Sequence, residues 1–122
     1  MNHIPKFHNY ACRGDSIIWT ADGFDIEAYI EQDHDSRPTD SDRYDAEQIK
    51  AWEFDQWFFC GVVLSVSRNG VVLSEHAASL WGVECNIGTD NDYLTEVCAD
   101  LEAEALDVAR IEVVRIREAL ED

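Results

Sequence analysis

The sequence predicts an α+β fold: an antiparallel three- or four-stranded sheet, with a long C-terminal helix packed on one face and a short helix before the central hairpin. Three observations predict it: an Asn-Gly pair between two β-branched runs, a stretch that alternates apolar and acidic residues, and a final segment with apolar residues every three or four positions. The length of 122 residues predicts a single domain over residues 1–122, in which residues 1–15 are expected to form a flexible N-terminus.

The middle of the chain predicts the hairpin. Trp57–Ser67 and Val71–Ala77 are rich in aromatic and β-branched residues, and Arg68-Asn69-Gly70 separates them. Asn and Gly both accept the positive φ that a two-residue hairpin turn needs. Because the first half of the leading strand is apolar on both faces, this strand is expected in the middle of the sheet.

Two further strands flank the hairpin in the sequence. Phe24–Glu31 alternates apolar and polar side chains, which predicts a half-buried strand with an acidic outer face. Ser79–Cys85 predicts an additional antiparallel strand, with Trp81 and Val83 on one of its faces. Between the first strand and the hairpin, a polar stretch around Pro38 predicts a loop.

Two helices are predicted. Asp45 to Phe54 has apolar residues at one-turn spacing and forms the short helix. The C-terminal helix begins after an N-cap at Asp90 or Asp92. An unbroken helix from Tyr93 to Glu121 would be about 44 Å long at 1.5 Å per residue. That length exceeds the diameter of a small domain, so a break or a dimer contact is expected.

The charge of the chain restricts its partners. The net charge is −17, from 26 acidic and 9 basic side chains, whereas a small domain needs a magnitude of only about 2–8 for solubility. Residues 22–55 have a net charge of −9 and residues 84–109 of −8, and residues 56–83 between them are neutral. Nucleic acid and anionic membranes are polyanions, so neither is expected as a direct partner. A basic protein surface or a metal is expected instead, and adaptation to high salt or simple solubility is the alternative.

One face of the C-terminal helix is a candidate interface. At 100° per residue, a row of acids falls opposite the apolar stripe: Glu96, Asp100, Glu104 and Asp107. Neighbours three or four residues apart lie about 5–6 Å from each other, which is similar to the spacing of phosphates along a nucleic-acid strand. No Lys or Arg interrupts the row before Arg110, although a solvated helix usually mixes both signs. The row predicts a surface that imitates the nucleic-acid backbone, and an ordinary solvated face is the alternative.

A second partner-binding patch is expected in the loop, formed by Asp33, Asp35, Asp40 and Asp42. Calcium is an alternative ligand, because Asp-x-Asp patterns supply oxygen atoms. The EF-hand pattern fails here, since a loop starting at Asp33 has Pro38 where Gly is needed and Tyr44 where the closing Glu is needed. A loop starting at Asp90 has Leu101 at its closing position.

The sequence predicts neither catalytic activity nor a bound cofactor. Zinc binding by His76 with Cys60 or Cys85 has no supporting ligand spacing, and a Cys60–His76 nucleophile pair would place its thiol inside an apolar strand. The chain has no P-loop, GxGxxG or GxSxG motif. The start MNHIPKFHNY lacks the apolar core of a leader, and no apolar run is long enough to span a bilayer. These features predict a cytoplasmic protein with four free cysteines: Cys12, Cys60, Cys85 and Cys98.

The segment ASLWGVECNIGTDNDYLTEVCADLEAEAL resembles a pattern of small uncharacterised proteins of bacterial viruses and mobile elements, in which an SLWG turn leads into a Tyr-Leu-x-Glu-Val helix. In its length, acidity and α+β character, the chain is also similar to anti-CRISPR and anti-restriction proteins that mimic DNA. This similarity implies inhibition of a nucleic-acid-binding defence complex in a bacterial host.

The expected function is therefore an inhibitor that occupies the basic groove of a nucleic-acid-binding protein or complex. One alternative is an immunity or antitoxin protein that blocks a single basic nuclease or toxin. Another is a structural or accessory oligomeric protein of a phage or mobile element, with Trp19, Trp52 or Trp81 exposed at a contact between copies.

Overall fold

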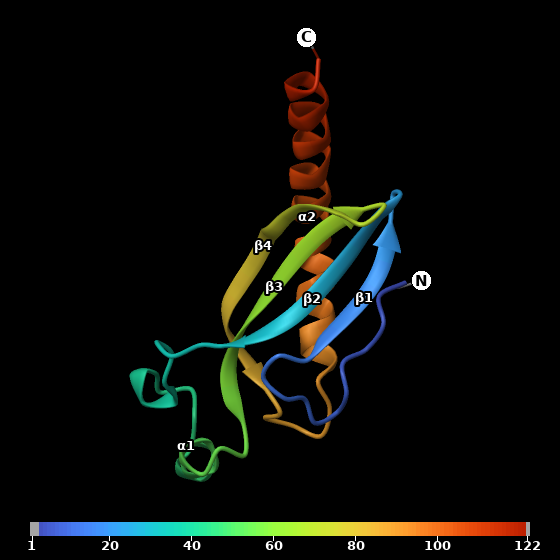
Figure 1. Cartoon of the computed structure of the whole chain (residues 1–122). Helices are drawn as coiled ribbons and strands as arrows, with labels where there is room; N and C mark the ends of the chain where they lie inside the picture. The colour runs from blue at the N-terminus through green and yellow to red at the C-terminus, as the bar shows by residue number, and fades with distance from the viewer. Residues whose placement is uncertain (1–2, 122) are drawn as a thin grey trace.

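The computed structural model describes residues 3–121 as a four-stranded sheet with one long helix behind it (Figure 1). The strands follow the order β1-β2-β3-β4, and each is antiparallel to its neighbours. The elements are β1 (Ser16–Ala21), β2 (Phe24–Gln32), the 3-10 helix η1 (Pro38–Asp40), α1 (Ala46–Glu53), β3 (Phe58–Arg68), β4 (Val71–Cys85) and α2 (Asp92–Ala119). The predicted fold class is confirmed.

Two tight turns set the order of the strands. Asn69 and Gly70 adopt φ values of 51° and 79° between β3 and β4, as the hairpin prediction requires. Asp22 and Gly23 adopt φ values of 52° and 80° between β1 and β2. β1 was not predicted as a strand, although Asp22-Gly23 is the same kind of turn signal.

β3 lies in the middle of the sheet, as predicted. It pairs with β2 along one edge and with β4 along the other. Every residue from Phe58 to Leu64 is buried, because α2 covers one face and side chains of the neighbouring strands and loop cover the other.

The strand predicted at Ser79–Cys85 is the second half of β4, which runs unbroken from Val71. The pairing register between β3 and β4 shifts between Cys60 and Val62, so that β4 bulges and bends there. Gly82, at this bulge, adopts a φ of 72°. The bulge places the Trp81 ring directly over Gly61 on the face away from α2, while Val83 is buried on the face toward α2. The expectation that Trp81 and Val83 share one face is therefore wrong.

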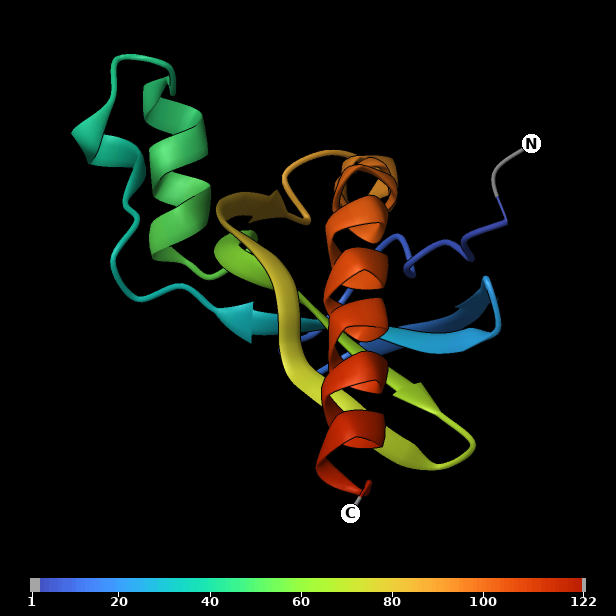
Figure 2. The same ribbon diagram turned by 90° about the horizontal axis from the view of Figure 1, so that it is seen from above.

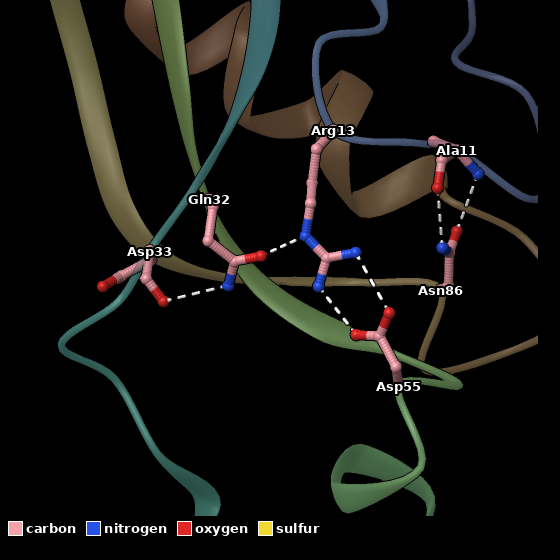
Figure 3. A network of polar contacts seen from close by, with 6 residues as sticks. All are labelled: Ala11, Arg13, Gln32, Asp33, Asp55 and Asn86. Carbon is pink, nitrogen blue, oxygen red and sulfur yellow. Dashed lines mark hydrogen bonds and ion pairs between the residues drawn. The ribbon is translucent and has the colours of Figure 1, made fainter.

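Residues 4–11 pack against the core, in contrast to the predicted flexible N-terminus, whose residues 1 and 2 lie outside the described part of the chain. Ile4, Phe7 and Ala11 are buried. Asn86 exchanges two hydrogen bonds of 2.8 Å with the Ala11 backbone (Figure 3). Asn91 occupies the N-cap position of α2, in place of the predicted Asp90 or Asp92, and its buried amide donates to the carbonyl oxygens of residues 8 and 9 instead of capping the helix.

Residues 33–57 form a lobe that projects from one end of the sheet (Figures 1 and 2). Asp45 and Gln48 make a capping box that begins α1, which confirms the predicted short helix. Tyr44 stacks on Trp57 at 5.4 Å between ring centroids, and it holds the lobe against the sheet by meeting the Phe59 ring of β3 edge-on at 5.9 Å. Burial, together with the hydrogen bond from its hydroxyl to Glu84, raises the pKa of Tyr44 to about 12.

α2 is a single unbroken helix of 28 residues, about 42 Å long at 1.5 Å per residue. It crosses the sheet on the side away from the viewer in Figure 1, and its C-terminal turns pass the tip of the β3–β4 hairpin. No helix within residues 3–121 is both long enough and apolar enough to cross a membrane.

Candidate acidic interface

The outward face of α2 carries the predicted row of acids. Leu94, Val97, Cys98, Ala105 and Ala109 are buried against the sheet and fix the rotation of the helix. The opposite face is exposed and carries Glu96, Asp100, Glu104 and Asp107. Positions four residues apart are separated by about 6 Å along the helix axis. The structure therefore brings these four acids into one exposed row.

The acids of the row differ in their ion pairing. Within residues 3–121, Glu96, Asp100 and Glu104 make no ion pair. The Asp107 carboxylate lies 3.2 Å from Arg110, whose guanidinium also contacts Asp22 at 2.5 Å. The charge of Asp107 is thus partly neutralised, and among the described residues the part of the row without an ion pair consists of three carboxylates.

Asp33 does not belong to the exposed second patch. Its side chain is 7% exposed and accepts hydrogen bonds from the backbone N–H of Asp35, Ser36 and Gly82 and from the Ser36 hydroxyl. Burial would raise the pKa of this carboxyl, but the hydrogen bonds outweigh it and hold the pKa below its ordinary value. Asp33 instead ties the start of the lobe to the bulge in β4, which corrects the predicted role.

The other predicted loop acids are exposed. Asp35, Asp40 and Asp42 make no ion pair within the described part of the chain. Asp35 and Asp40 line a hollow of about 280 Å³ together with Arg37 and Arg43, so both signs of charge are present there. This patch is therefore less purely acidic than the row on α2.

The lobe approaches the N-terminal end of α2 at one place. Arg43 of the lobe, Glu84 of β4 and Tyr93 of α2 line a hollow of about 200 Å³. Elsewhere the lobe and α2 lie apart in both views (Figures 1 and 2). The two predicted patches are thus neighbours at one end of α2 and do not form one continuous surface.

Asp55, another acid of residues 22–55, is exposed but forms an ion pair within the chain. Arg13 donates to both carboxylate oxygens of Asp55, at 2.7 and 3.2 Å, and also contacts the Gln32 side chain (Figure 3). The hydrogen bond with Arg13 lowers the pKa of Asp55. The network links the N-terminal segment to the base of the lobe.

The sheet face opposite α2 is a surface that the sequence only partly indicated. Ile18, Val72 and Trp81 are 63%, 59% and 47% exposed on it. Hollows of about 330 and 250 Å³ share Glu27, Ser65 and Val72 in their walls. Alternation in residues 24–31 predicted the acidic strand on this face, but not the apolar side chains from β1 and β4 beside it.

The residues considered for zinc are divided between the two faces of the sheet. Cys60 and Cys85 are fully buried on the face toward α2, whereas the His76 ring contacts Tyr29 on the opposite face. Within residues 3–121, no three or more His, Cys, Asp or Glu side chains are arranged to hold a metal ion.

Thiol labelling should separate the one exposed cysteine from the three buried ones. Cys12 is exposed, whereas Cys60, Cys85 and Cys98 are buried. A contact with the Cys85 sulfur, together with burial, raises the pKa of the Cys60 thiol, and burial raises the pKa of Cys98 to about 12. Because the thiolate is the reactive form, we expect a disulfide reagent at neutral pH to modify one thiol in the native protein and four after denaturation. Rapid modification of two or more native thiols would contradict this packing.

Comparison with protein-family models, curated proteins and solved structures found no match to this chain. The functional argument therefore rests on the chain's own surfaces.

Proposed function

We propose that this protein is an inhibitor that binds the basic nucleic-acid-binding surface of another protein by presenting the carboxylates of α2. The observation that carries the proposal is the exposed row of Glu96, Asp100 and Glu104, which has no ion-pair partner within residues 3–121. Like charges at this spacing destabilise a helix by a few tenths of a kcal/mol per pair. A row of like charges that destabilises the helix in this way is consistent with a cationic partner that offsets the repulsion.

The geometry of the row suits a surface built for phosphates. One carboxylate projects from each successive turn, about 6 Å apart along a rigid axis. The helix is held by its buried face, so little backbone order has to be gained on binding. Arg and Lys side chains that normally contact phosphates can form charge-assisted hydrogen bonds to carboxylates instead.

The net charge of −17 supports the same mechanism over longer distances. A strongly charged surface steers an oppositely charged partner and raises the rate of association, and salt weakens this attraction. The inhibitor would compete with nucleic acid for the same basic groove. A nucleic-acid-binding defence complex of a bacterial host is the kind of target that fits this chemistry.

A capture experiment tests the proposal. The immobilised protein is incubated with bacterial lysate, and bound proteins are eluted in parallel with duplex DNA and with a rise in salt from about 0.05 to 0.5 M. We expect one nucleic-acid-binding protein or complex to be released by both treatments. Retention through high salt and excess DNA, or capture of no nucleic-acid-binding protein, would contradict mimicry.

An immunity or antitoxin protein is a second candidate, favoured by the sheet face opposite α2. Ile18, Val72 and Trp81 are exposed there, and Ile18 and Val72 line a hollow together with Glu27. Apolar anchors surrounded by charge are typical of an interface that selects one partner. In the same experiment, capture of a single small basic toxin that resists high salt would favour this function.

A further inference from the structure

The apolar stripe of α2 continues beyond the part that the sheet covers. Val113 and Ile116 follow the buried Ala109 on the same face and are half-buried, and Leu120, one turn later, is 79% exposed. The last turns of a helix that lack tertiary packing are only marginally stable in water. This end of α2 therefore offers an apolar face that the other described residues, 3–109, cover only in part.

A cleft of about 450 Å³ separates this face from the tip of the β3–β4 hairpin. Val71 and Leu73 line one wall, and Val113 and Ile116 line the other. Val71 is 55% exposed. Leu120 extends the apolar stripe past the mouth of the cleft. The exposed apolar surface at this end of the molecule therefore consists of the cleft and the Leu120 side chain beside it.

The charge at this end differs from that of the rest of the molecule. Residues 110–122 contain three basic and four acidic side chains, a net charge of −1, in a chain whose net charge is −17. Arg117 lies at the rim of the cleft and makes no ion pair within residues 3–121. Two copies of this strongly acidic protein would repel each other least where they meet at these ends.

We infer that the C-terminal turns of α2 and the hairpin tip form a homodimer interface, in which Leu120 of each copy enters the cleft of the other. In a two-fold symmetric dimer, both insertions form together, because the same surface of each copy supplies the inserted side chain and the cleft that receives it. Antiparallel crossing of the two helix ends also places Glu121 of one copy near Arg117 of the other. This interface lies at the opposite end of α2 from Glu96 and Asp100, so it leaves their carboxylates accessible to a basic partner.

The oligomeric state of the full chain tests the inference. Mass is measured by light scattering from about 10 µM to about 1 mM protein. We expect the mass to rise with concentration from 13.9 kDa toward twice that value. Salt should strengthen association or leave it unchanged because it screens the repulsion between copies, whereas it should weaken binding of a basic partner. A mass of 13.9 kDa at every concentration would overturn the inference and leave the proposed function untouched.

Matched variants locate the interface. Leu120→Asp and Val71→Asp each place a charge at the proposed contact, and both should hold the mass at that of the monomer at every concentration. Ile111→Asp is the control, since Ile111 is 65% exposed on the other face of the same helix. It should leave the concentration dependence as in the unmodified protein, and circular dichroism should show an unchanged fold for all three. Equal loss of association in the control, or no loss in Leu120→Asp and Val71→Asp, would overturn the inference.

Discussion

Removing the three free carboxylates of α2 should lower the affinity for the captured partner at least about 100-fold, if each interfacial ion pair contributes about 1 kcal/mol. The variant is Glu96→Gln, Asp100→Asn, Glu104→Gln, which keeps side-chain size and one of the two acceptor oxygens while removing the charge. All three side chains are exposed, so the free energy of unfolding should change little. The measurement is the dissociation constant by calorimetry at about 0.15 M salt.

A control with the same change in net charge separates the row from the general acidity. The variant Glu47→Gln, Glu53→Gln, Glu75→Gln removes three exposed charges outside both predicted patches and outside the proposed dimer interface. It should alter the affinity by no more than about 3-fold, through weaker long-range attraction. Equal losses in the two variants would mean that net charge, and not the row, determines binding. Asp35→Asn, Asp40→Asn, Asp42→Asn then measures the contribution of the loop patch.

Asp33→Ala should lower the free energy of unfolding by about 2–4 kcal/mol, because it removes a charged acceptor and leaves buried N–H groups without a partner. The substitution should also destabilise the structure locally, around the N–H groups that Asp33 binds. Backbone amides of Ser36 and Gly82 donate to this carboxylate at 3.2 and 2.8 Å. We therefore expect faster hydrogen exchange at both amides, together with a lower denaturation midpoint.

Asp35→Ala is the matched control, since Asp35 is exposed and its carboxylate makes no ion pair within residues 3–121. It should change the free energy of unfolding by less than about 0.5 kcal/mol. A similar loss in both variants would contradict the internal role of Asp33.

The contribution of Asp33 should also depend on pH. Its pKa is lower in the folded protein than the ordinary value of 3.8, so its stabilisation is fully present above that value. The stabilisation is lost as pH falls through the lower folded pKa. The difference in stability between the unmodified protein and Asp33→Asn should therefore shrink below about pH 4. A difference that stays constant down to pH 2 would contradict the lowered pKa.

Local patterns in the sequence determined most of the secondary structure. Asn69-Gly70 requires positive φ and fixed the hairpin, and alternation in residues 24–31 fixed which face of β2 is buried. The capping pair Asp45 and Gln48 began α1. Each of these signals acts over a few residues, so each can be read without knowing the fold. The same kind of signal at Asp22-Gly23 would have identified β1.

The sequence by itself also determined the row of acids on α2, because helical periodicity places Glu96, Asp100 and Glu104 opposite the apolar stripe. Only the tertiary structure decided which acids are free to meet a partner. Asp107 shares Arg110 with Asp22, which lies 88 residues before that arginine, and Asp33 is enclosed by the bulge at Gly82. Such pairings depend on distances between segments that are far apart in the chain. Charge and periodicity can therefore predict an acidic surface, but which carboxylates are already bound by other parts of the chain is decided by packing.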